Sequence, residues 1–391
     1  MSGYPTAVIL TPDRQEISRI AGGQDLASYA DLLDLALDGV RPLPDVLATL
    51  STPGNSSLSA ADCRRLAYNG WSLDPDVAPD ALVETLLTAA ERCPIGAVHE
   101  RDRLAVAAVD LAARAERPRI EAGETPSARL AGLLDVLEAL LAHRERSLAT
   151  GDVLLSLPDD AFVIERLVRP SGVAALRDRW FALMDALEGD ERFAVSTRLM
   201  SAASRLEVAK ALDADGQVPE SVAQRSRATL DAFLARDYDA DARSGVVNSA
   251  SWVLIQLGDD ARLRSLLEAQ LRASKTAYYY LPDLADIEER AGRPTEALAL
   301  LERGYREARG TATRFQWGAL YVDGLLRLSP RDEPRIRSAT LAVIAELDGP
   351  DRIHARARSR LERLHASLDR WARETGHGAT LEVVGRRWAQ L

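Results

Sequence analysis

The sequence predicts a mostly α-helical fold, an α-solenoid of helical hairpins preceded by a partial ββα unit. Its 391 residues are 47% hydrophobic but only 5% aromatic, and Ala, Leu, Arg, Glu and Asp dominate. Such a composition favours helices over sheets. From residue 58 onward apolar residues recur at helical spacing, and no convincing strand follows Ile20. The length is sufficient for two or three domains.

The first elements are two strands and a helix. Ala7 to Leu10 is an apolar run with two β-branched residues, which predicts a strand covered on both faces. Thr11 to Asp13 has turn chemistry, and the more polar Glu16 to Ile20 predicts an edge strand. Gly22-Gly23 ends that strand, and Gln24 to Leu37 shows helical spacing.

Together with the step Gly3-Tyr4-Pro5-Thr6, this order resembles the C-terminal half of a thioredoxin fold. In that family the step carries a cis proline. The cis form is a small minority of X–Pro bonds, so a fold that retains one generally uses it. The resemblance covers about residues 3 to 37. It implies that Pro5 is the cis proline, that Tyr4, Pro5 and Thr6 contact a substrate peptide, and that Gly22 follows the last strand.

The first half of the thioredoxin fold has no counterpart, and the sequence contains no Cys-x-x-Cys motif. Thiol–disulfide exchange needs a low-pKa thiolate and a nearby resolving thiol. We therefore expect a truncated member of a thioredoxin-like family, or a descendant that lost the chemistry. The chain as given should be inactive, whereas a full-length parent would be a thiol–disulfide oxidoreductase.

Prolines and glycines between Asp38 and Ser57 predict a linker, although Val46 to Leu50 could form a helical turn. Ser59-Ala60-Ala61-Asp62 is a capping box that should open a helix reaching Asn69. Further helices are predicted at about 80–92, 95–116, 126–149, 151–156, 159–168, 173–187, 191–212, 219–236 and 240–257.

One internal repeat is present. Shifting residues 247–274 by 34 superposes Gly258 on Gly292 and Leu267 on Leu301. This period resembles the tetratricopeptide repeat, although the Trp and closing Pro of that pattern are absent. The resemblance implies stacked hairpins, with a third, looser unit at Trp317–Leu347.

These signals divide the chain into four predicted segments. They are the C-terminal half of a thioredoxin-like domain (1–38), a linker (39–57), divergent helical hairpins (58–240) and tetratricopeptide-like repeats (241–391).

Tyr278-Tyr279-Tyr280 is the main candidate binding site among the helices. Three consecutive residues on a helix span about 200°, so at least one ring should reach a groove or the surface. Tyrosine is a favoured contact residue there. Phe315, Trp317 and Tyr321 could extend such a patch. The alternative is packing between adjacent hairpins.

The cysteines Cys63 and Cys93 are interpreted as two unpaired buried thiols, with a structural disulfide as the first alternative and a redox-active pair as the second. The five histidines are scattered and show no metal-ligand spacing. Asp237, Asp239 and Asp241 resemble the start of a calcium loop, but Ala242 replaces the required glycine, which favours a helix N-cap. We predict no catalytic residue, no metal site and no cofactor.

The net charge is −10, and only Lys210 and Lys275 are lysines, so basic residues alternate with acids. This argues against nucleic-acid binding. No uncharged apolar run approaches the roughly 20 residues of a membrane span. The expected partner is a protein or peptide, and a homodimer would form through the exposed strand edge. The compartment is periplasmic or extracellular if an upstream signal peptide has been lost, and cytoplasmic otherwise.

Two functions follow. In the first, a thioredoxin-family protein uses its helical domain to bind substrate, with thiol–disulfide exchange or redox-linked chaperoning as the parent activity. In the second, the chain is a non-catalytic tetratricopeptide-like scaffold for protein interactions.

Overall fold

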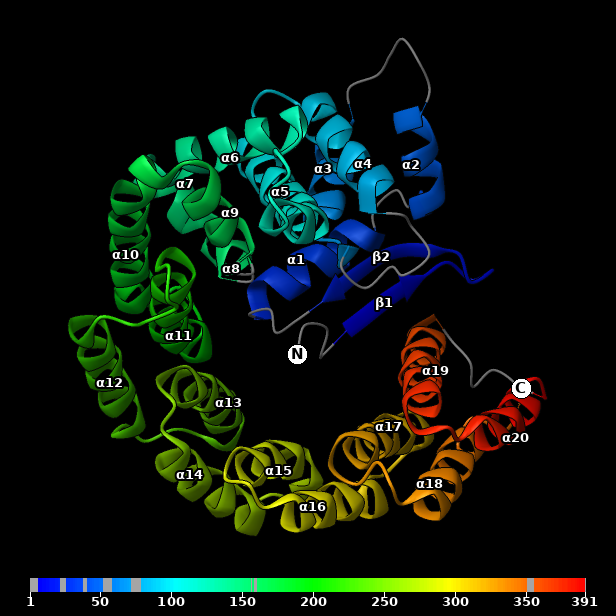
Figure 1. Cartoon of the computed structure of the whole chain (residues 1–391). Helices are drawn as coiled ribbons and strands as arrows, with labels where there is room; N and C mark the ends of the chain where they lie inside the picture. Colours follow the sequence, from blue (N-terminus) through cyan, green and yellow to red (C-terminus); the bar gives the residue numbers. More distant parts are fainter. Residues whose placement is uncertain are drawn as a thin grey trace. The chain divides into compact units, whose positions relative to one another are not determined.

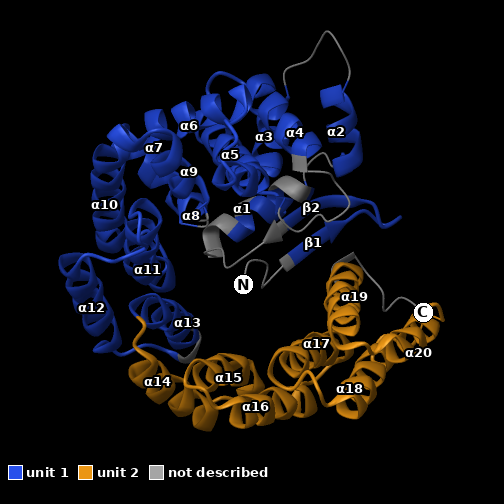
Figure 2. Cartoon of the chain, in the orientation of Figure 1, with its two compact units in different colours: residues 1–257 blue, residues 258–391 orange. Residues whose placement is uncertain are grey.

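The computed structural model describes residues 6–21, 26–37, 41–51, 58–71, 79–155, 157, 160–349 and 355–390. Over these ranges the chain is mostly helical and has one two-stranded sheet, as the composition predicts (Figure 1). It divides into two compact units, residues 1–257 and 258–391 (Figure 2). In the described ranges, no helix combines the length and apolarity needed to cross a membrane. The four-segment division stays a prediction.

Unit 1 begins with an antiparallel hairpin of β1 (Thr6–Leu10) and β2 (Glu16–Ala21). Its helices are α1 (Leu26–Leu37), α2 (Leu43–Ser51), α3 (Ala60–Ala67), α4 (Pro79–Arg92), α5 (Val98–Glu121), α6 (Ala128–Leu141), α7 (Arg144–Ala149), α8 (Gly151–Leu154), α9 (Asp160–Val168), the 3-10 helix η2 (Pro170–Gly172), α10 (Val173–Gly189), α11 (Val195–Leu212), α12 (Glu220–Leu234) and α13 (Ala240–Leu257).

Most predicted helices agree with these bounds to within a few residues, with two clear differences. The helix expected at 95–116 continues as α5 past Pro118 to Glu121. A proline inside a helix removes one backbone donor and crowds the preceding turn, but here the helix continues and the added turn buries Ile120. The helix expected at 126–149 is interrupted at Ala142 and His143, so that it forms α6 and α7.

The roles predicted for the two strands, β1 covered on both faces and β2 at the edge, are wrong. β1, expected to be covered on both faces, leaves Val8 46% and Leu10 48% exposed. β2, expected to be the edge strand, buries Ile17 and Ser18. The reason is that β2, and not β1, packs against helix α2. The apolar run, the turn residues and the glycine pair therefore located the strands, but they did not indicate which strand the helices cover.

Helix α3 occupies the outer edge of β2. The Arg65 side chain donates from Nη2 to the carbonyl of Ile17 (2.8 Å) and to the carbonyl of Arg41 (2.7 Å). Just after α3, Asn69 Oδ1 accepts the Arg19 N–H (3.2 Å), and the Gly70 N–H donates to the Arg19 carbonyl (2.8 Å). The Ile17 carbonyl and both backbone groups of Arg19 are thereby satisfied within the same unit.

The predicted linker is largely a packed helix. Within its described part, residues 43–51 form α2, whose Leu43, Val46 and Leu50 are buried in the main core of unit 1. Their spacing of three and four residues is the signature of an amphipathic helix. The prolines Pro42 and Pro44 fit because a helix tolerates proline in its first turn.

Unit 2 consists of α14 (Asp260–Ala273), the 3-10 helix η3 (Ala277–Tyr280), α15 (Leu281–Arg290), α16 (Pro294–Glu307), α17 (Thr311–Leu328), α18 (Glu333–Ala345), α19 (Ala355–Thr375) and α20 (Gly378–Trp388). Helices α15, α17 and α19 follow one side of this unit, and α14, α16, α18 and α20 follow the other (Figure 1). The corner glycines of the predicted repeat, Gly258 and Gly292, have φ of 68° and 71°. These conformations favour glycine.

Glycines permit close helix contacts in unit 2. A Cβ added at Gly318 on α17 would lie 2.5 Å from Val343 Cγ2 and 3.1 Å from its Cγ1. Val343 is on α18 and is fully buried. Because a β-branched side chain in a helix has one strongly preferred rotamer, Val343 cannot turn away from an added methyl group. Gly318 therefore sets the distance between α17 and α18.

We expect Gly318→Ala to destabilise the protein by about 1–2 kcal/mol, because overpacking a core costs about 1–3 kcal/mol and exceeds the gain in helix propensity. Gly385→Ala on α20 is the matched control, since a Cβ added there would meet nothing within 4 Å. That variant should gain about 0.5–1 kcal/mol. Urea unfolding of both variants checks the pair. Equal shifts of the two midpoints would contradict the packing role of Gly318.

A buried acid lies in unit 1. Glu165 on α9 is only 2% exposed, and its Oε1 has no hydrogen-bond partner among the described residues. Its nearest cation is Arg169, with Nη1 3.7 Å from Oε1. Burial raises the pKa of Glu165 to about 7, and Arg169 opposes the shift while Glu138 and Asp135 add to it. The carboxyl group therefore titrates near neutral pH.

This shift has a definite sign for stability. Between an ordinary pKa of 4.5 and the folded value of about 7, the folded chain holds a proton that the unfolded chain has lost. The free energy of unfolding therefore falls as pH rises through this window. We expect Glu165→Gln to stabilise the protein at pH 8 by on the order of 2–3 kcal/mol, and much less at pH 5. Urea unfolding at both pH values checks it, and an equal effect at both would contradict it.

Candidate functional site

The N-terminal residues predicted to bind peptide are mostly outside the described ranges. Tyr4 and Pro5 lie there, as does Gly22, so the expected cis proline stays a prediction. Thr6 is described as the first residue of β1. The part of this segment that the structure describes is the β-hairpin itself.

The three tyrosines lie on the 3-10 helix η3 and not on an α-helix. Tyr278 is buried, Tyr280 is half-buried and Tyr279 is 39% exposed. At least one ring was expected to reach the surface, and Tyr279 does so. Its ring stacks on that of Tyr278, with centroids 4.9 Å apart, and meets Trp317 edge to face at the same distance.

The aromatic residues expected to extend this patch are core residues. Phe315, Trp317 and Tyr321 are each at most 5% exposed. Trp317 Nε1 donates to the Tyr278 carbonyl (2.8 Å), which ties α17 to η3. These contacts agree with the alternative of packing between hairpins. Peptide binding by Tyr278, Tyr279 and Tyr280 stays a prediction, and Tyr279 is the most exposed of the three.

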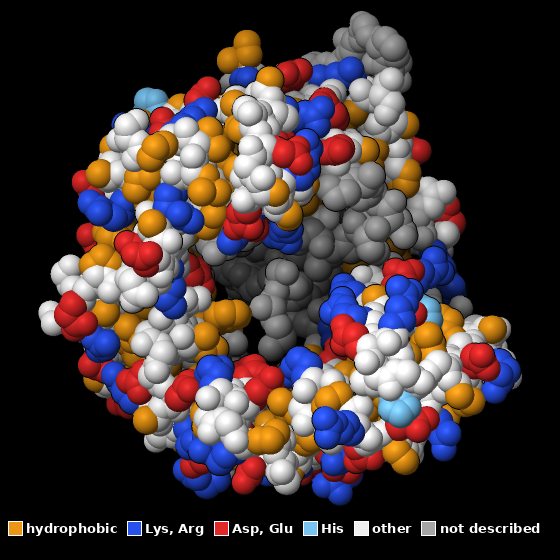
Figure 3. All heavy atoms as spheres, in the orientation of Figure 1, with side chains coloured by type: hydrophobic (Ala, Val, Ile, Leu, Met, Phe, Trp, Pro, Cys, Tyr) orange, Lys and Arg blue, Asp and Glu red, His pale blue; other side chains and the backbone are white. Residues whose placement is uncertain are grey.

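A row of charged side chains crosses α15, α17 and α19 on one side of unit 2, and we call it the charged row. On α17, Arg327 pairs with Glu289 of α15, with Nη2 and Oε2 2.6 Å apart. The row is acidic on α15 and basic on α19, and Figure 3 shows basic side chains gathered over α19. Its members are Asp283, Asp286 and Glu289 on α15, Asp323 and Arg327 on α17, and Arg360 and Arg363 on α19.

Asp323 connects the middle of the charged row to its basic end. Partial burial raises its pKa, and this shift is opposed by Arg327, by a hydrogen bond from Ser367 and by Arg360 and Arg363. Residues 360, 363 and 367 are spaced by three and four, so they lie on one face of α19. At the opposite end, the Asp286 side chain is exposed and makes no hydrogen bond or ion pair with a described residue. Partial desolvation nevertheless raises its pKa, and the nearby Arg290 and Arg327 oppose this shift.

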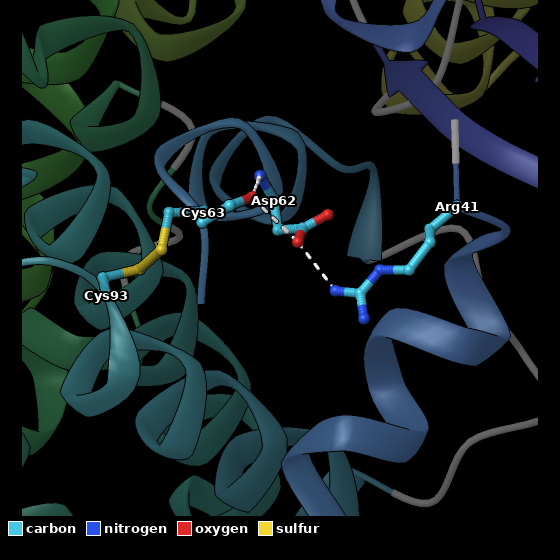
Figure 4. Close-up of a disulfide and its surroundings, with 5 residues drawn as sticks. Arg41, Asp62, Cys63 and Cys93 are labelled. Carbon is cyan, nitrogen blue, oxygen red and sulfur yellow. Dashed lines mark hydrogen bonds and ion pairs between the residues drawn. A yellow bond between two sulfur atoms is a disulfide. The ribbon is translucent and has the colours of Figure 1, made fainter. Parts of the chain in front are cut away.

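Cys63 and Cys93 form a disulfide, which corrects the expectation of two unpaired thiols (Figure 4). Their Cα atoms are 5.7 Å apart, within the usual range for such bonds. Cys63 is fully buried and Cys93 is 5% exposed. The bond joins α3 to the residue after α4, and its burial makes it a structural connection.

Beside the disulfide, Asp62 accepts hydrogen bonds from Arg41 Nη2 (2.7 Å) and Ser59 Oγ (2.9 Å) (Figure 4). The Asp62 N–H donates to Ser59 Oγ (3.0 Å), so Ser59 is the predicted N-cap of α3. These contacts fix the first turn of α3.

A second polar cluster lies between α3 and α5. Tyr68 and His99 share a hydrogen bond of 3.0 Å between the hydroxyl and Nε2. The Arg103 guanidinium lies 3.7 Å from the Tyr68 ring centroid and pairs with Asp152. Burial raises the pKa of Tyr68 and lowers the pKa of His99. Both groups are thus neutral at pH 7. His99 Nδ1 is buried and has no hydrogen-bond partner among the described residues.

No metal site is found in the described ranges, where no three His, Cys, Asp or Glu side chains are grouped to hold an ion. Asp239 Oδ1 accepts the Ala242 N–H (2.8 Å). This contact confirms the interpretation of the acidic stretch as a helix N-cap.

Sequence reasoning missed the charged row. Its members recur at spacings of three or four within each helix, but the pairing of α15, α17 and α19 on one side depends on the stacking of hairpins. A count of charges at helical spacing on alternate predicted helices could have found it.

Comparisons with known proteins identify no relative: no family model, no curated protein and no solved structure matches this chain.

Proposed function

We propose that this chain is a non-catalytic scaffold for protein interactions, and that the charged row of unit 2 binds an extended polypeptide segment. The observation that carries this proposal is the change of charge along one side of consecutive helices, from Asp283 and Asp286 on α15 to Arg360 and Arg363 on α19. Electrostatic complementarity of this kind gives a surface specificity and a direction of binding.

The alternative for any charged row is a solvated face whose charges pair internally. Part of this row does so, because Glu289 pairs with Arg327 and Asp323 is held near the arginines of α19. Asp286 has neither an ion pair nor a hydrogen bond among the described residues. A partner with positive charge at the α15 end and negative charge at the α19 end would complete the row.

Membership in the thioredoxin family, with thiol–disulfide exchange or redox-linked chaperoning as the parent activity, stays a prediction. The sequence has two cysteines, and both belong to the buried disulfide. Nothing in the described ranges favours exchange chemistry over binding.

The test uses the full chain and two labelled peptides of identical composition. In one, lysines occupy one half and glutamates the other, and in the second the same residues alternate. We expect the segregated peptide to bind more tightly, and the difference to shrink at high salt because exposed charges are screened. Fluorescence polarisation at two salt concentrations measures both effects. Equal affinities at low salt would contradict the proposal.

A charge-swapped variant, Asp286→Arg with Arg363→Glu, should weaken binding of the segregated peptide by about tenfold. Glu296→Arg with Arg337→Glu is the matched control, because it makes the same exchange on exposed positions of α16 and α18. The control should leave the affinity unchanged. Thermal melting of both variants confirms that each remains folded. A loss of affinity as large in the control would place the binding elsewhere.

A further inference from the structure

The outer edge of β1 carries backbone groups that face away from β2. The Thr11 N–H donates to the Gln15 carbonyl across the hairpin, so residue 11 bonds inward. On β2, Arg19 bonds outward to Asn69 and Gly70, and Arg19 is opposite Val8. Because the two backbone groups of a strand residue point the same way and alternate along an antiparallel pair, the groups of Val8 and Leu10 point outward.

No described residue bonds to this outward row. The outer edge of β2 is filled by Arg65, Asn69 and Gly70, but the corresponding groups of Val8 and Leu10 make no hydrogen bond within the described ranges. The hairpin is thus asymmetric. One edge is occupied by a helix and its following turn, and the other offers donors and acceptors.

The side chains of β1 lack the usual protection of an exposed edge. Proteins normally blunt such edges with charged residues, proline or strong twisting. The five residues Thr6–Leu10 include no charge and no proline, whereas β2 carries Glu16 and Arg19, which pair with each other at 2.7 Å. Val8 and Leu10 expose apolar side chains on one face, at 46% and 48%.

We propose that the outer edge of β1 binds a short, extended and uncharged peptide segment of another protein as a third strand. Backbone hydrogen bonds to Val8 and Leu10 would supply the pairing, and alternate apolar side chains of the peptide would cover their exposed side chains. The uncharged strand selects an uncharged segment, since a buried unpaired charge is costly. The edge of β1 and the charged row have no residue in common, and each proposal has its own peptides and variants, so the two proposals succeed or fail independently.

A second copy of the chain is the weaker occupant. A five-residue strand spans roughly 17 Å, while stable specific interfaces use about 20–30 residues on each side. Two copies would also bring together two net charges of −10, which repel. A short uncharged peptide needs no large interface and adds no charge repulsion, because its binding needs only the strand edge.

The test measures binding of a labelled, capped six-residue peptide of alternating valine and threonine to the full chain by fluorescence polarisation. Its control is the same peptide N-methylated at alternate residues, which cannot donate along one edge. We expect the unmodified peptide to bind and the methylated peptide to bind at least about tenfold more weakly. Equal binding of both peptides, or of neither, would overturn the proposal.

Substitutions in β1 test whether the peptide binds at this edge. Val8→Pro removes an outward N–H and no hydrogen bond of the hairpin, because proline is tolerated on an edge strand. It should weaken the peptide by about tenfold or more, whereas Val8→Thr keeps the donor and should retain most of the affinity. Leu10→Lys leaves the backbone donors and acceptors unchanged and should also weaken binding. It tests the same edge independently in case the Val8→Pro variant does not fold. Sedimentation checks the other occupant: a dimer that Val8→Pro dissociates would assign the edge to a second copy and overturn the proposal.

Discussion

The N-terminal part of the molecule depends on one buried guanidinium group. Arg65 is 4% exposed, and its hydrogen bonds to the carbonyls of Ile17 and Arg41 attach the β-hairpin and the segment before α2 to helix α3. An isolated two-stranded hairpin is marginally stable in water. Burying a cation is costly unless it is paired and hydrogen-bonded, and Asp62 provides the partner at 3.6 Å. Desolvation accordingly lowers the pKa of Arg65.

The position of α3 is itself fixed by covalent and capping contacts. Ser59 caps its first turn, and the Cys63–Cys93 disulfide ties its middle to the end of α4. A disulfide that closes a loop of this length stabilises a fold by about 2–4 kcal/mol. Helix α3 and the turn after it then bond to one edge of the hairpin, whereas the other edge, along β1, has no hydrogen-bonded neighbour among the described residues. The difference between the two edges of the sheet thus follows from the contacts that fix α3, not from contacts between the two strands.

Unit 2 obtains its order in a different way. Its helices pack through glycines such as Gly318, where a methyl group would meet Val343, and through buried tryptophans such as Trp317, whose indole N–H bonds to Tyr278. Hairpins stacked by such contacts place alternate helices on the same side. That arrangement brings Asp286, Arg327 and Arg363 into one charged row, although they are far apart in the sequence.

The sequence predicted local structure well and long-range arrangement poorly. Helical spacing and Ser59 located α3, and the glycines Gly258 and Gly292 located two hairpin corners, because these signals act within a few residues. The sequence did not indicate that α2 packs in the core, that β2 and not β1 is covered, or that Cys63 meets Cys93. Each of these depends on which helix lies against which face. The charged row was missed for the same reason.

The claim that Arg65 holds the hairpin is tested most directly by hydrogen exchange, followed by mass spectrometry, of Arg65→Met in the full chain. The account predicts faster exchange in peptides covering β1 and β2, with unchanged exchange in α11, which packs against α9, α10, α12 and α13. Arg144→Met, an exposed change on α7, should leave all of these peptides unchanged. Protection of β1 and β2 that persists in Arg65→Met would contradict the account, as would a uniform loss of protection throughout residues 1–257.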